Sequence, residues 1–242
     1  MSARENILAK LKKAGALPME EPAVFDYYRE KGVSWDSEAE RLKHWAAAMR
    51  AVKTEIYWVT KSNWMQVFRE AAEGKGLKNI LLPLATEHGQ IARAALAGSN
   101  IDPIAFEREI DTWKTEFFTN IDAGFSGAQC GIARTGTLML FSSPEEPRTL
   151  SLVPPVHFCL FDTSKMYNEF HNAVEGEKLV ENGMPTNVFL ISGPSKTADI
   201  QLTLAYGAHG PRDLVILAIL PDHISPADLE ENARLRKPSS ST

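Results

Sequence analysis

The feature that most constrains the fold is an alternation of short apolar runs with stretches of helical periodicity, which begins at Glu55 and ends at Leu220. Strands are predicted at 56–60, 79–84, 100–106, 137–141, 156–161, 188–191 and 214–220. Helical stretches stand between several of them, and a crossover helix is the usual way to join parallel strands. The alternation therefore predicts an α/β domain with a mainly parallel sheet and helices on both faces.

The alternating region divides the chain into three predicted parts. Residues 1–54 form an N-terminal helical segment, residues 55–221 the α/β domain, and residues 222–242 a C-terminal tail. Ser37 and Glu40 have the spacing of a capping box at the start of a helix. An apolar stripe typical of core packing follows them, made by Leu42, Trp45, Ala46, Met49 and Val52.

Composition excludes several classes of function. The 242-residue chain carries a net charge of −5 without a basic or acidic block, which argues against nucleic-acid and anionic-membrane binding. Its apolar runs stay well short of the roughly 18 residues that a membrane span needs. The N-terminus, Met1–Lys13, has the charged pattern of a helix rather than of a signal peptide, so a cytoplasmic location is expected.

The chain has two cysteines, Cys130 and Cys159, and they do not form a C-x-x-C motif. Two thiols cannot fill a four-thiolate iron–sulfur site or a cysteine-rich zinc site. They are expected to be buried free thiols, as is common in cytosolic proteins. No metal and no resident cofactor is predicted.

The stretch Ile191–Gly210 carries the strongest local pattern for a ligand site. The apolar run Val188–Ile191 predicts a buried strand, the turn Ser192–Thr197 follows, and a mostly apolar helix is then expected to end at Gly207. A helix N-terminus offers unpaired N–H groups to an anion. The alternative is that Ser195 or Thr197 simply caps the helix. The spacing of a phosphate-binding P-loop is absent.

The middle of the chain adds three features. The segment Ile121–Phe125 is expected to lead into a short helix. The turn Thr135-Gly136-Thr137 precedes a strand, and a glycine there lets the backbone approach a ligand closely. Pro154-Pro155 makes a stiff entry to the strand at 156–161. His157, near the start of that strand, is either a hydrogen-bonded core residue or an acid–base group.

Three separated segments resemble one known family. They are GIARTGTLML, RTLSLVPPVHF and ISGPSKTADIQLTLAYGAHGPRDL, and in this order and spacing they resemble the LUD domain of the lactate-utilisation protein C (LutC/YkgG) family. The start ARENILAKLKKA is also similar, so the resemblance covers nearly the whole chain. It implies a three-layer α/β/α fold related to the sugar-phosphate isomerase and CoA-transferase group (NagB/RpiA-like).

The resemblance also implies a role in bacterial L-lactate oxidation to pyruvate. In that system the family works in the cytoplasm with two iron–sulfur partner proteins. The shortage of cysteines fits an accessory component without its own cluster. One position departs from the family pattern, since Arg134 stands where the family usually has an acidic residue. This weakens a mechanism based on an activated glutamate. The arginine either binds a carboxylate or phosphate, or is a surface substitution.

Three functions remain open from the sequence. The first is the accessory role in lactate oxidation. The second is an enzyme or sensor that binds a carboxylate, phosphate or CoA-type ligand at the carboxyl ends of the parallel strands. The third is a pure interaction protein whose glycines and prolines serve the backbone. For the second, His157 or His209 is the candidate acid–base group. One anion pocket is expected from Arg134, Thr135, Gly136, Thr137, His157, Ser192, Gly193, Ser195, Lys196 and Thr197.

Overall fold

The computed structural model describes residues 2–15, 22–106, 110–198 and 204–229. By its contacts the chain separates into two compact units, Met1–Gly32 and Val33–Thr242. Among its described residues, the first unit holds helices α1 (Ala3–Lys13) and α2 (Val24–Lys31). Helix α1 begins at a complete capping box, in which the Ser2 hydroxyl accepts from the Glu5 N–H and the Glu5 carboxylate accepts from the Ser2 N–H.

The second unit is built on a six-stranded sheet whose strands are all parallel, which confirms the predicted mainly parallel α/β fold. Strand β7 lies near its centre, between β12 and β4. In spatial order the strands are β1 (Glu55–Val59), β12 (Asp213–Ile219), β7 (Val156–Asp162), β4 (Ala123–Gly127), β2 (Asn79–Leu82) and β3 (Asp102–Ala105).

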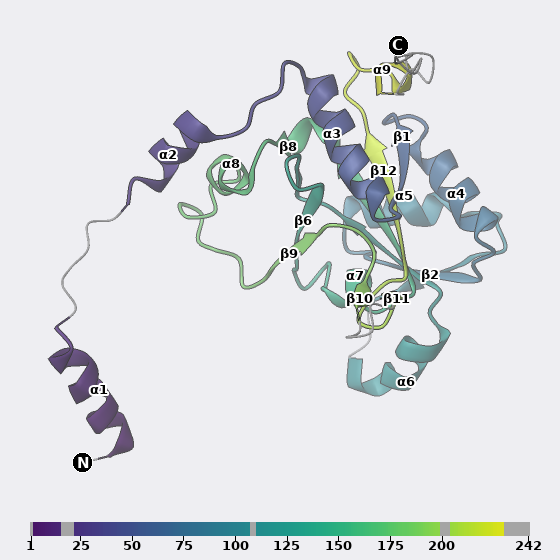
Figure 1. Ribbon diagram of the computed structural model, residues 1–242. Helices are drawn as coiled ribbons and strands as arrows, with labels where there is room; N and C mark the ends of the chain where they lie inside the picture. The colour runs from purple at the N-terminus through teal and green to yellow at the C-terminus, as the bar shows by residue number, and fades with distance from the viewer. Residues whose placement is uncertain (1, 16–21, 107–109, 199–203, 230–242) are drawn as a thin grey trace, which may run out of the picture. The chain divides into compact units, whose positions relative to one another are not determined.

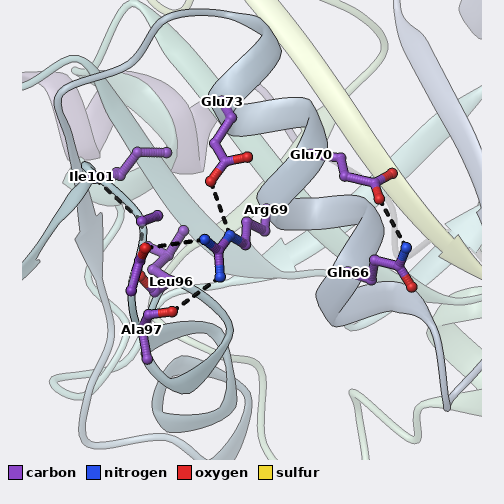
Figure 2. A network of polar contacts seen from close by, with 9 residues as sticks. Gln66, Arg69, Glu70, Glu73, Leu96, Ala97 and Ile101 are labelled. Atoms are coloured by element: carbon purple, nitrogen blue, oxygen red, sulfur yellow. Dashed lines mark hydrogen bonds and ion pairs between the residues drawn. The ribbon is translucent and has the colours of Figure 1, made fainter.

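Two helices, α4 (Trp64–Gly74) and α5 (Glu87–Ala95), cover one face of this sheet (Figure 1). The Phe68 ring of α4 lies 5.0 Å from the ring of Phe125 and 5.3 Å from that of Phe158. Figure 2 shows how Arg69 of α4 reaches the end of α5 and donates to the carbonyl of Ala97 at 3.0 Å. A cation at a helix C-terminus is favourable, so this contact helps hold the two helices together.

The opposite face is covered by helix α3 (Glu38–Ala51) and a four-stranded second sheet. The Trp45 ring of α3 packs 5.4 Å from the ring of Phe161 on β7. The Ser37 hydroxyl accepts from the Glu40 N–H at 3.2 Å, which confirms the Ser37 half of the predicted capping box, while the Glu40 carboxylate accepts from Lys43. The strands of the second sheet, in spatial order, are β8 (Met166–Tyr167), β5 (Cys130–Ile132), β6 (Thr137–Phe141) and β9 (Val188–Ile191).

Short helices complete the second unit. Trp113 and Phe117 of α6 pack against Leu81 of β2 and Leu150 of α7. The helices are α6 (Ile110–Asn120), α7 (Thr149–Leu152), α8 (Phe170–Gly176) and α9 (Pro226–Leu229). The domain boundaries at 54/55 and 221/222 stay predictions, while α3 packs into the core of the α/β unit. Across the described residues, no helix is long and apolar enough to cross a membrane.

The helix expected after the turn at Ser192–Thr197 is wrong. Strand β10 (Lys196–Ala198) pairs antiparallel with β11 (Leu204–Tyr206), and residues 199–203 lie outside the described part of the chain. The reason is tertiary: the Ser195 N–H donates to the Pro211 carbonyl and the Gly207 N–H donates to the Ser195 carbonyl. These bonds hold Ser195 next to Gly207 and Pro211, whereas the two ends of one continuous helix over this segment would lie apart.

Two further predictions are corrected. The short helix expected after Phe125 is wrong, because this part of the chain forms strands β4 and β5. Strand β4 packs so closely on α7 that a Cβ at Gly124 would lie 2.0 Å from the Leu150 carbonyl oxygen. The strand at 188–191 exists as β9, but it is an edge strand and not a buried one, and Leu190 is 51% exposed. Its residues are at most half-buried because β9 lies at the end of the strand order and pairs with β6.

Candidate functional site

A cavity of about 170 Å³ gathers several of the residues singled out in the sequence. It is lined by His157, by the run Leu190–Ser195, by His209–Pro211 and by Leu214, with Ser151 and Leu152 beside them. His157 and Leu214 are the second residues of β7 and β12 and are paired in register. The cavity, called here the amino-edge cavity, therefore lies at the amino ends of these strands. The expectation that the motif loops meet at the carboxyl ends is wrong.

Ser195 organises the loop that forms one wall of this cavity. Its hydroxyl oxygen accepts a hydrogen bond from the His209 N–H at 3.3 Å. Gly210 lies so close that a Cβ there would stand 3.3 Å from the Ser195 Cβ. The Ser195 backbone bonds to Pro211 and Gly207 join the same two segments. Ser195 therefore joins two segments of the loop and does not cap a helix, which was one interpretation of the sequence. Its O–H can still donate a hydrogen bond to a ligand.

A chain of hydroxyls links two of the predicted motif loops. Thr135 Oγ1 and Thr137 Oγ1 are 2.7 Å apart, and Thr137 Oγ1 lies 2.7 Å from Ser192 Oγ. Thr137 is buried, while Ser192 lines the amino-edge cavity. The structure therefore brings the turn at 135–137 next to the cavity through Ser192.

The two motif glycines approach a helix. Gly136 has φ +57°, and a Cβ there would lie 2.6 Å from the Ala48 Cβ of α3. Gly193 has φ +118°, and a Cβ there would lie 2.5 Å from Val52 Cγ2, just after the same helix. Both positions need a residue without a side chain for backbone geometry and for packing. The close approach anticipated for a ligand is thus made to α3 and the residue that follows it.

His157 is a hydrogen-bonded core residue. Its Nε2 lies 2.7 Å from Ser126 Oγ, and both residues are almost fully buried. Burial lowers the pKa of His157 to about 3, so its ring is neutral at pH 7. It can exchange hydrogen bonds at the cavity wall, but it brings no positive charge to an anion.

The charged candidates lie outside the cavity lining. Arg134 is exposed and its guanidinium donates to the carboxylate of Glu169, which also accepts from the Val33 N–H at 3.1 Å. Burial alone raises the pKa of Glu169, but the hydrogen bonds from Arg134 and Val33 and the Arg134 charge hold it below its usual value. Lys196 is exposed at the start of β10. Thr197 follows it there, and neither residue lines the amino-edge cavity.

Replacing Arg134 by alanine is expected to lower the free energy of unfolding by about 1–2 kcal/mol at pH 7, because the Glu169 carboxylate stays buried without its cation. The loss is smaller than for a fully buried ion pair, because the arginine side chain is exposed. Glu169 has a lowered pKa, so its contribution is present above its ordinary pKa and is lost as the pH falls through the lowered one. Urea unfolding should therefore give a smaller difference at pH 4 than at pH 7. Arg134→Lys is the control that keeps the charge, and an equal loss at both pH values would contradict the pairing.

Glu169 and Ser126 were missed by the sequence analysis. Ser126 stands 31 positions before His157 and Glu169 stands 35 positions after Arg134, and no local periodicity reports such pairs. Neither motif nor spacing marks them. Within the described ranges, no group of three or more His, Cys, Asp or Glu side chains is arranged to hold a metal ion.

In a comparison with known protein families, residues 42–219 match the LUD domain. An uncharacterized protein of Neisseria meningitidis serogroup B is 97% identical over 96% of this chain and 100% of its own length. A lactate utilization protein C of Shouchella clausii is 33% identical over 37% of this chain, and the match spans 40% of that protein.

One solved structure has the same fold. It is a DUF162 family protein of Deinococcus radiodurans, with a TM-score of 0.56 and 20% sequence identity. The match covers 76% of this chain and 98% of that protein. At this identity the likeness concerns the fold alone.

Proposed function

Because the chain belongs to the LUD domain family, we propose that it takes part in bacterial L-lactate utilisation, as an accessory protein of L-lactate oxidation to pyruvate. The observation that carries the proposal is the family match over 42–219, together with a relative named lactate utilization protein C. We propose further that it works with iron–sulfur proteins and holds no cluster of its own.

The placement of the two thiols supports the absence of a cluster in this chain. Cys130 lies on β5 of the second sheet and Cys159 on β7 of the central sheet, and both are buried. Burial, with a smaller effect of Glu177, raises the pKa of Cys130 to about 12, and burial also raises that of Cys159. An iron–sulfur cluster requires several thiolates or imidazoles around one centre. Two protonated thiols on separate sheets do not provide such a centre.

The amino-edge cavity is the site that we assign to a small carboxylate of the lactate or pyruvate kind. Its volume of about 170 Å³ is below the roughly 300 Å³ at which sites for drug-sized ligands begin, so it suits a ligand of few atoms. Ser192 and Ser195 offer hydroxyl groups, and the remaining wall is mostly apolar. The same cavity also supports the alternative function, in which the protein is an enzyme that acts on a small molecule or a sensor that responds to one.

Deletion of the gene is expected to abolish growth on L-lactate as sole carbon source and to leave growth on pyruvate unchanged, because the proposed step precedes pyruvate. The wild-type gene should restore growth. A gene carrying Ser195→Ala should restore it poorly, whereas Lys196→Ala, a change beside the cavity but outside its lining, should restore it fully. Normal growth on L-lactate of a deletion strain without a second copy would refute the role.

A further inference from the structure

A second cavity, of about 300 Å³, lies on the opposite side of the central sheet from the first, beyond the carboxyl ends of the strands. Its lining includes Gly127, Asp162 and Ile219, which are the last residues of β4, β7 and β12. It is called here the carboxyl-edge cavity. It shares no lining residue with the amino-edge cavity.

The order in which the chain connects the strands predicts a ligand site beyond these carboxyl ends. Strands β2 and β4 are neighbours, but β2 leads through α5 to β3 on one side, while β4 leads towards β7 on the other. Ligands of open α/β sheets bind outside the carboxyl ends of the strands, in the crevice where the connections diverge in this way. His88, in the first turn of α5, and Gly127, at the end of β4, come from the two sides of that crevice and both line the cavity.

A histidine–carboxylate pair stands in this crevice. His88 Nε2 lies 2.9 Å from Glu146 Oε2, and the other oxygen of Glu146 accepts from the Gly127 N–H. A Cβ at Gly127 would lie 3.3 Å from the His88 ring, so the imidazole rests on the glycine backbone. The Thr86 hydroxyl accepts from the Gly89 N–H and fixes the first turn of α5. Both members of the pair are thus held from more than one direction.

The remaining polar groups determine the ligand chemistry. Asp162 Oδ1 accepts from the N–H and the hydroxyl of Ser164, which orients this carboxylate at the end of β7. Gln129 also lines the cavity, and its amide donates to the Glu177 carboxylate. No lysine or arginine is among the described residues that line the cavity. The two carboxyl groups accept hydrogen bonds and do not favour an anion, so hydroxyl groups are the ligand atoms that match them.

We propose that the carboxyl-edge cavity binds a small uncharged polyhydroxy compound. Its hydroxyl groups donate to Glu146 and Asp162, and the His88 ring exchanges a hydrogen bond with a further hydroxyl. The site is separate from the carboxylate site assigned to the amino-edge cavity, and it needs neither a metal nor the Arg134–Glu169 pair.

The test is an NMR titration of the full ¹⁵N-labelled chain with D-ribose. Saturable shifts are expected at the amide signals of His88 and Gly127. Asp162→Asn is expected to weaken ribose binding at least fivefold, and Glu146→Gln likewise. D-ribose 5-phosphate and the diamine putrescine serve as anionic and cationic probes and should bind at this site at least tenfold more weakly than ribose.

The matched control is Asp228→Asn. Asp228 also accepts from the N–H and hydroxyl of a serine, Ser225, but lies outside this cavity, so ribose binding should be unchanged. An unchanged Tm of Asp162→Asn would show that its weaker binding of ribose does not come from unfolding. No saturable shift with ribose, or tighter binding of either charged probe, overturns the proposal. L-lactate is followed in parallel at Ser195 and His209, so failure of one site does not imply failure of the other.

Discussion

Replacing His157 by glutamine is expected to remove most of the fold's sensitivity to acid between pH 6.5 and pH 4. The buried ring has a pKa of about 3 in the folded chain, against roughly 6.5 for an unfolded one. The unfolded chain therefore binds a proton first as the pH falls. Stability from the neutral ring is complete above pH 6.5 and decreases towards pH 3, by about 3 kcal/mol at pH 4.

The measurement is urea unfolding of the wild type and of His157→Gln at pH 7, 5 and 4. At pH 7 the variant should be less stable by about 1–2 kcal/mol, because the bond to Ser126 is disturbed. At pH 4 its stability should equal or exceed that of the wild type. His209→Gln replaces an exposed histidine and is the control, with a pH dependence like that of the wild type. Parallel curves for all three proteins would show that His157 is not kept neutral by burial.

The architecture follows from patterns that the sequence displays directly. Apolar runs such as Val156–Phe161 and Leu214–Leu220 are long and continuous because both faces of a parallel strand are buried. They are found as β7 and β12, within one residue of the predicted bounds. The amphipathic stripe of α3 is equally local, since Leu42, Trp45 and Met49 recur at helical spacing and all lie in the core.

The errors arise where distant contacts override a local pattern. The run after Ser195 has helical composition, yet its described ends form the antiparallel pair β10 and β11, next to the bonds from Ser195 to Pro211 and Gly207. The candidate site shows the same limit. Thr137 and Ser192 were both placed in one predicted anion pocket, and their hydroxyl oxygens lie 2.7 Å apart. The partner of Arg134, however, is 35 positions away and was not predictable from spacing. The His88–Glu146 pair joins the first turn of α5 to the loop after β6, and no motif connects these two segments.

A single substitution tests whether Gly136 in the Thr135-Gly136-Thr137 turn is required for packing or for a ligand. Gly136→Ala is expected to lower the free energy of unfolding by about 2–5 kcal/mol. About 1–2 kcal/mol comes from placing a side chain at φ +57°, and about 1–3 kcal/mol from forcing its Cβ against Ala48, 2.6 Å away. The structure thus makes this glycine a packing requirement of α3 on the second sheet.

Gly76→Ala is the matched control for Gly136→Ala, since Gly76 has φ +66° and a Cβ there would meet nothing within 4 Å. This variant has only the cost of placing a side chain at positive φ, so its free energy of unfolding should fall by about 1–2 kcal/mol in the same urea unfolding experiment. The difference between the two variants isolates the contact with Ala48. Equal losses would remove the packing explanation, and the glycine would then have to be explained by backbone conformation or by a ligand at the turn.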